Sequence, residues 1–76
     1  MKKAIQQETL KALVSASALR EVRSVRVEGG WVVEARLGLG WLPVRSRREP
    51  VRVWSSLTAV ERFCTKAGSK TLLVEL

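Results

Sequence analysis

The chain has 76 residues, 14 of them Lys or Arg and seven of them Glu, and it contains no His, Asp, Asn or Tyr. A domain of this size buries only about 60% of its unfolded surface, which leaves little room for a deep catalytic cleft. Histidine-based catalysis, histidine-ligated metals and Asp-containing triads are excluded within this chain, so the sequence predicts one domain, residues 1–76, that is not an enzyme and has no metal or cofactor.

The first predicted element is a helix over residues 3–19. Ala, Gln, Glu, Leu and Lys, which are good helix formers, fill most of this stretch. One side of the helix carries a short, mainly apolar stripe that needs a sheet or another partner to pack against. The stripe consists of Ile5, Thr9, Ala12, Leu13 and Ala16, with Leu10 and Val14 beside it.

A pair of strands is predicted next, because apolar and polar residues alternate from Glu21 onwards. The two strands cover residues 21–28 and 31–37. Between them stands Gly29-Gly30, which is a two-residue hairpin signal.

A third strand is predicted over residues 41–46, after a reversal at Gly38-Leu39-Gly40. Pro43 lacks an N–H group, which indicates that this strand lies at an edge of the sheet or bends there. Residues 51–54 are again extended, either as a fourth short strand or as a continuation of the third.

The second predicted helix begins after Ser55-Ser56, which supply an N-cap, and ends before Gly68. A closing strand follows over residues 71–76. The order α-β-β-β-(β)-α-β predicts an α+β fold, a single small domain with an antiparallel sheet packed by two helices. The apolar residues that recur at helical spacing are Leu57, Val60, Phe63, Cys64 and Ala67.

The basic residues are mainly Arg and give the chain a net charge of +7. Arg presents a planar fork that suits phosphate, and Trp can stack on bases, so both together are typical of a single-strand binding platform. Alternation along strands could bring Arg36, Arg45 and Arg52 to one polar face. The alternative is that the tryptophans lie in the core or at an edge and the arginines form a solvated surface. The candidate binding residues are Arg36, Trp41, Arg45, Arg47, Arg48, Arg52 and Trp54.

The only cysteine, Cys64, lies on the apolar stripe of the second helix and has no His partner in the chain. These surroundings predict a buried packing thiol rather than a nucleophile. A single cysteine, polar residues after Met1-Lys2-Lys3 and the absence of a long apolar run predict a protein of the reducing cytoplasm.

A pattern of residue types and spacings runs through most of the chain from about residue 10. It consists of residues 49–57, 59–63, Gly68 and 73–75, together with the helix-to-strand junction at residues 15–20 and 22–25. In this pattern the chain resembles ParC, a family of small plasmid-encoded partition-associated proteins that are distinct from the topoisomerase subunit of the same name. The resemblance implies a role in the maintenance of a plasmid or another mobile element, and it brings no catalytic residues.

Two functions therefore stand beside each other. The first is a basic, non-enzymatic accessory protein that binds DNA, single-stranded DNA included. The second is a protein-binding adaptor, or a small inhibitor of a host or plasmid nucleic-acid machine, whose arginines meet an acidic protein surface. An open strand edge could also allow the chain to form a homodimer.

Overall fold

A five-stranded sheet forms the centre of the molecule, in a computed structural model that describes residues 4–16, 21–38 and 40–76. Three strands run antiparallel in the middle of it: β2 (Glu21–Val27), β3 (Gly30–Leu37) and β4 (Gly40–Arg45). They are the three strands that period-two alternation predicts. The predicted hairpin is confirmed, but its turn is Glu28-Gly29, because Gly30 already pairs with Val27 as the first residue of β3.

The two edge strands make the sheet mixed rather than antiparallel. β1 (Ile5–Gln6) lies parallel to β4, and β5 (Leu73–Glu75) lies parallel to β2. The strand order across the sheet is β1-β4-β3-β2-β5. Neither parallel pair is consecutive in the chain, since α1 (Gln7–Ser15), β2 and β3 lie between β1 and β4, and β3, β4 and α2 (Leu57–Ala67) lie between β2 and β5. The element order is β-α-β-β-β-α-β, so the α+β class is confirmed and the N-terminal strand is an addition.

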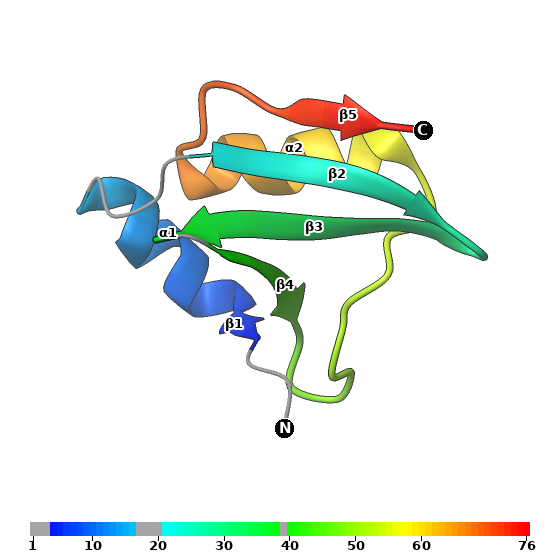
Figure 1. The fold of residues 1–76 in the computed structure, drawn as a ribbon, viewed down its shortest axis with the longest axis horizontal. Coiled ribbons are helices and arrows are strands. Elements are labelled where there is room, and N and C mark those ends of the chain that lie inside the picture. Colours follow the sequence, from blue (N-terminus) through cyan, green and yellow to red (C-terminus); the bar gives the residue numbers. More distant parts are fainter. Residues whose placement is uncertain (1–3, 17–20, 39) are drawn as a thin grey trace.

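Both helices pack on one face of the sheet, and the described residues place no helix on the opposite face, which is called the helix-free face below (Figure 1). α2 (Leu57–Ala67) runs behind β2 in this view and contacts β3, and α1 (Gln7–Ser15) lies beside β4 and contacts α2. In the space between helices and sheet, apolar side chains form one continuous core. The buried members of this core are Ile5, Leu10, Val22, Val33, Ala35, Val44, Trp54, Val60, Cys64 and Ala67.

α2 begins and ends where its sequence predicts. The Ser56 hydroxyl accepts a hydrogen bond from the Ala59 N–H, and Gly68 has the left-handed conformation, with φ of 93°, that a C-terminal glycine allows. Val60 and Cys64 are buried, whereas Leu57 and Phe63 are only partly buried. Phe63 therefore lies at the margin of the core rather than in its centre.

α1 is shorter than the helix predicted over residues 3–19, because the chain is extended at Ile5–Gln6 before it turns. Residues 3 and 17–19 lie outside the described part of the chain. The helix faces the core with Leu10, Leu13 and Val14, whereas Ala12 is exposed. Thr9, Ala12 and Ala16 of the predicted stripe are exposed, so the prediction is wrong at these three positions. The larger side chains Leu10, Leu13 and Val14 face the core instead.

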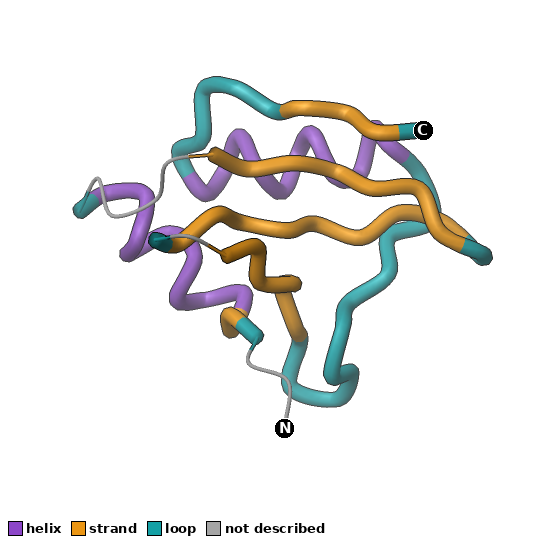
Figure 2. The backbone as a smooth tube through the Cα atoms, in the orientation of Figure 1, coloured by secondary structure: helices purple, strands orange, loops and turns teal. Residues whose placement is uncertain are grey.

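The remaining connection, residues 46–56, is a long loop that returns from the end of β4 towards β3 (Figure 2). No fourth strand forms in it. A single bridge joins Trp54 to Trp31 of β3 through two backbone hydrogen bonds of 2.8 Å. This connector (residues 46–56) thus continues the sheet where β4 diverges from β3. Pro43, predicted at an edge or a bend, pairs with Glu34 of β3 on one side and has no partner in β1 on the other.

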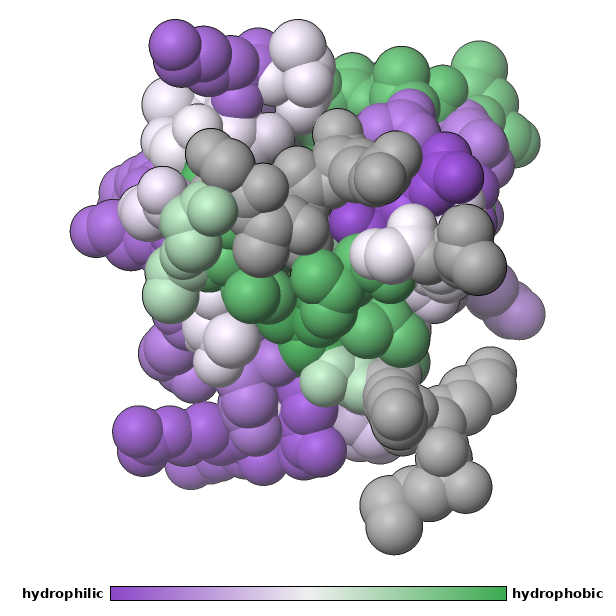
Figure 3. All heavy atoms as spheres, turned by 60° about the vertical axis from the view of Figure 1, so that its left-hand side comes forward, coloured by the Kyte–Doolittle hydropathy of each residue, from purple (hydrophilic) through white to green (hydrophobic). Residues whose placement is uncertain are grey.

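The surface combines charged rims with small apolar areas. Seen from the side of α1, apolar side chains occupy the centre and the upper right of the view, and hydrophilic ones lie to the left and below (Figure 3). β1 and β5 are the two edge strands of the sheet, and β5 exposes both Leu73 and Val74. Within the described residues, no helix is both long and apolar enough to cross a membrane.

Candidate nucleic-acid interface

The sheet divides the predicted binding residues between its two faces. Arg36 pairs with Trp41 across β3 and β4, and Arg45 has the same parity along β4, so these three share the helix-free face. Arg52 and Trp54 point to the other side, where their side chains meet α2. The prediction that Arg52 shares a polar face with Arg36 and Arg45 is therefore wrong. The chain turns between Ser46 and Glu49 and then returns beside β4, where the Arg52 N–H donates to the Val44 carbonyl at 2.9 Å. Alternation along β4 therefore does not extend through the turn to Arg52.

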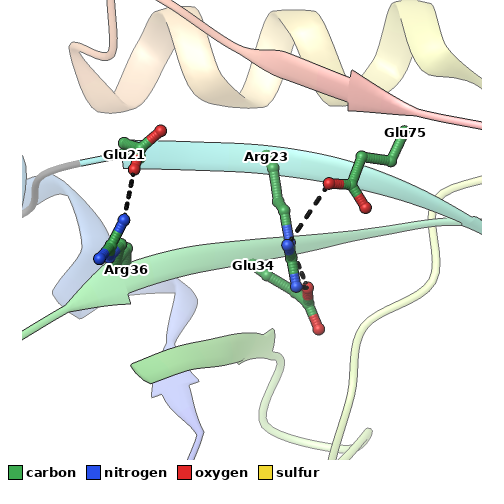
Figure 4. Close-up of polar contacts among 5 residues, drawn as sticks. All are labelled: Glu21, Arg23, Glu34, Arg36 and Glu75. Atoms are coloured by element: carbon green, nitrogen blue, oxygen red, sulfur yellow. Dashed lines mark hydrogen bonds and ion pairs between the residues drawn. The ribbon is translucent and has the colours of Figure 1, made fainter. Parts of the chain in front are cut away.

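An arginine that sequence reasoning missed organises the helix-free face. Arg23 of β2 reaches across β3, and its guanidinium lies 4.0 Å from the centre of the Trp41 ring. The same guanidinium donates to Glu34 from Nε at 2.7 Å and lies 3.5 Å from Glu75 (Figure 4). Arg23 lies outside the arginine-rich stretch of residues 36–54, so local charge density does not indicate it. The alternation in β2 does, because it places Arg23 on the same face as Trp41.

Ion pairs neutralise two of the three arginines placed on this face, Arg23 and Arg36. Arg36 bonds to Glu21 at 2.9 Å, and Arg23 is paired with Glu34 at 2.6 Å (Figure 4). Half-exposed pairs of this kind contribute little to stability, about 0.2 to 1 kcal/mol each, but they cancel positive charge locally. One side of Trp41 is also covered by Arg23. Arg36 and Trp41 therefore do not form an open platform on which bases could stack.

The tip of the connector, in contrast, presents uncompensated positive charge. Arg47 and Arg48 are exposed, and among the described residues neither is part of an ion pair. Ser46 and Glu49 on either side of them are joined by three hydrogen bonds of 3.1 to 3.2 Å, one of which engages the Glu49 carboxylate. Arg45 at the base of the turn donates from Nε to the Ser46 carbonyl at 3.2 Å.

The connector is fixed on both sides of the sheet. On the helix-free face, Val51 lines a small apolar depression together with Val27, Val32 and Pro43. On the helix face, Trp54 is 4% exposed and packs against Phe63 with 4.9 Å between the ring centres. Trp54 is therefore a core residue, and its ring is not available to stack on a base.

Cys64 is 3% exposed, and burial raises the pKa of its thiol to about 11. The predicted packing role agrees with this position. Because the thiolate is the reactive form, a rise from 9.0 to about 11 leaves about a hundredfold less thiolate at neutral pH.

We expect the native protein to react slowly with a maleimide at pH 7.5, and at least a hundredfold faster once urea has unfolded it. The raised pKa also means that stability is present below pH 9 and falls as the pH rises towards 11, since the unfolded chain loses the proton first. A Cys64→Ala variant should lack that part of the alkaline loss. Rapid labelling of the folded chain would show that the thiol is accessible.

No group of three Cys or Glu side chains that could hold a metal ion occurs in the described part of the chain. Comparison with protein-family models, with curated proteins and with solved structures finds no match to this chain. The fold and the site together define a small α+β domain with an arginine-bearing connector, and the resemblance to ParC stays a prediction.

Proposed function

We propose that this domain is a non-enzymatic protein that binds DNA through phosphate contacts made by Arg45, Arg47 and Arg48. The observation that carries the proposal is the contrast between these three arginines and Arg23 and Arg36. Arg23 and Arg36 are neutralised by glutamates, whereas Arg45 at the end of β4 and Arg47 and Arg48 of the connector are grouped at an anchored turn. Arg is well suited to bidentate phosphate contacts.

The mode of binding that fits this arrangement is sequence-independent contact with the backbone. Trp54 is buried and one side of the Trp41 ring is covered by Arg23, so neither ring is free to stack on a base. Duplex DNA is the better substrate for such a turn than a single strand, because its phosphates are regularly spaced and require no stacking platform. The resemblance to ParC supports the setting, which is the maintenance of a plasmid or another mobile element in the reducing cytoplasm.

The test replaces Arg45, Arg47 and Arg48 together by Gln. Binding to a 20-base-pair duplex, measured by fluorescence anisotropy between 50 and 200 mM salt, should weaken for every DNA sequence alike. If each arginine contacts one phosphate, the slope of log K against log salt should become smaller by about 2.7, at about 0.9 per contact.

A matched variant controls for net charge. Replacing Arg62, Lys66 and Lys70 by Gln also removes three positive charges, and both variants have a net charge of 7 − 3 = +4. The control should keep the slope of the parent chain. Equal loss in the two variants would mean that DNA responds to overall charge and that the connector is no specific site.

A further inference from the structure

The side of α2 that borders the connector carries an apolar groove with a cationic margin. Its volume is about 810 Å³, and its exposed lining is mainly apolar. The groove follows α2 from Ser56 to Lys66, which is about 15 Å at a rise of about 1.5 Å per residue. A peptide in an extended conformation covers that length with about five residues, at about 3.3 Å each.

Arg52 is held in a fixed position in this groove. Its guanidinium lies 4.5 Å from the ring centre of Trp54 and 5.8 Å from that of Phe63. One of its nitrogens, Nη1, donates to the Gln7 side chain at 2.6 Å. Among the described residues no carboxylate forms an ion pair with it, so the rest of its donor edge can receive a ligand. An arginine that is stacked and tethered loses less conformational freedom when it binds a carboxylate.

Two further cations line the same groove. Arg62 and Lys66 are four residues apart, which places them on one side of α2, and Glu61 is the only acidic side chain in the lining. The charge of the lining is therefore 3 − 1 = +2 beside the surface formed by Phe63 and Ala59. Apolar contacts with a cationic margin are complementary to a peptide in which acidic and apolar side chains alternate.

We infer that this groove is a docking site for an acidic, amphipathic peptide segment of a partner protein. A carboxylate of the peptide binds the free edge of Arg52, and neighbouring apolar side chains pack on Phe63. Nucleic acid fits the same groove less well, because its apolar lining offers nothing to a sugar-phosphate backbone and Glu61 repels it. The site is separate from the connector tip, so it is independent of the proposed DNA binding.

The probe is a fluorescein-labelled decapeptide in which Glu alternates with Leu and Phe, and the control peptide has Gln in place of Glu. We expect saturable binding of the acidic peptide to the full chain, with NMR shift changes at residues 52–66. Arg52→Gln should weaken binding at least tenfold, whereas Arg47→Gln, which removes the same charge outside the groove, should change it less than twofold.

Two further measurements keep the test decisive. Arg62→Gln leaves the Gln7 contact intact and should still weaken binding about threefold, even if Arg52→Gln is unstable. Equal binding by Arg52→Gln and Arg47→Gln, shift changes on β2 to β4 instead of the groove, or no saturation at millimolar peptide would each overturn the inference. So would displacement of the peptide by a 20-base-pair duplex, since the groove would then be part of the DNA surface.

Discussion

Replacement of Trp54 by Ala should unfold much of the protein at 37 °C. Trp54 is 4% exposed, packs on Phe63 and carries the backbone bridge to Trp31. Truncation of a buried Trp costs about 3 to 5 kcal/mol. The free energy of unfolding of a protein is about 0.05 to 0.15 kcal/mol per residue, which gives about 4 to 11 kcal/mol in total for a chain of this length. Thermal melts followed by circular dichroism should show a Tm lower by about 12 °C or more.

Val53→Ala is the matched control for this change. Val53 precedes Trp54 in the same segment but is 41% exposed, so its truncation should change the free energy of unfolding by no more than about 0.5 kcal/mol. Trp54→Phe should lie between the two, since it keeps an aromatic ring against Phe63. A Trp54→Ala variant that melts within 2 or 3 °C of the parent would show that the connector is not anchored in the core.

Most of the fold follows from local patterns. The alternation in residues 21–37 predicts the central hairpin because one face of each strand meets the core and the other does not. Ser56 and Gly68 mark the ends of α2 because their cap roles depend only on neighbouring backbone groups. Strand β1 could not be found in this way, since two residues, Ile5 and Gln6, have no measurable period and are extended only through pairing with β4.

The candidate site was harder to predict because it depends on which face each residue reaches. Arg36 and Arg52 look alike in the sequence, yet one is paired with Glu21 on the sheet and the other is stacked on Trp54. Their difference arises at the turn between Ser46 and Glu49, where the chain leaves the strand. No periodicity crosses such a turn. The neutralisation of Arg23 by Glu34 likewise depends on register, which pairs residues eleven positions apart.

The connector links the fold to both proposed binding sites. The connector contributes Arg47 and Arg48 to the DNA proposal and Arg52 to the peptide groove, and it is held to the sheet by the Trp31–Trp54 bridge. A change that opens this bridge should disturb both sites at once, whereas charge substitutions at either site should act alone. The residue that controls the bridge sterically is Gly30.

Gly30→Ala should be the most damaging of the glycine substitutions. A Cβ at this position would lie 2.1 Å from the Trp54 carbonyl oxygen, and that oxygen accepts the 2.8 Å hydrogen bond from the Trp31 N–H. The backbone cannot relieve this overlap unless the bridge opens. Gly30 also has φ of 151°, which L-residues rarely adopt. Overpacking costs about 1 to 3 kcal/mol and backbone strain a similar amount, so together they should lower the free energy of unfolding by about 2 to 5 kcal/mol.

Substitutions at two other glycines distinguish steric overlap from backbone strain. Gly29 has φ of 88° with nothing within 4 Å of an added Cβ, so Gly29→Ala should show backbone strain alone, about 1 to 2 kcal/mol. An added Cβ at Gly40 also meets nothing within 4 Å, and this residue is not among the glycines with positive φ, so Gly40→Ala should be close to neutral. Urea unfolding gives the three losses, and amide exchange at Trp31 and Trp54 reports the bridge itself. If Gly30→Ala were no less stable than Gly29→Ala and kept both amides protected, the close approach of the connector to β3 would be wrong, and with it the anchoring on which both arginine sites depend.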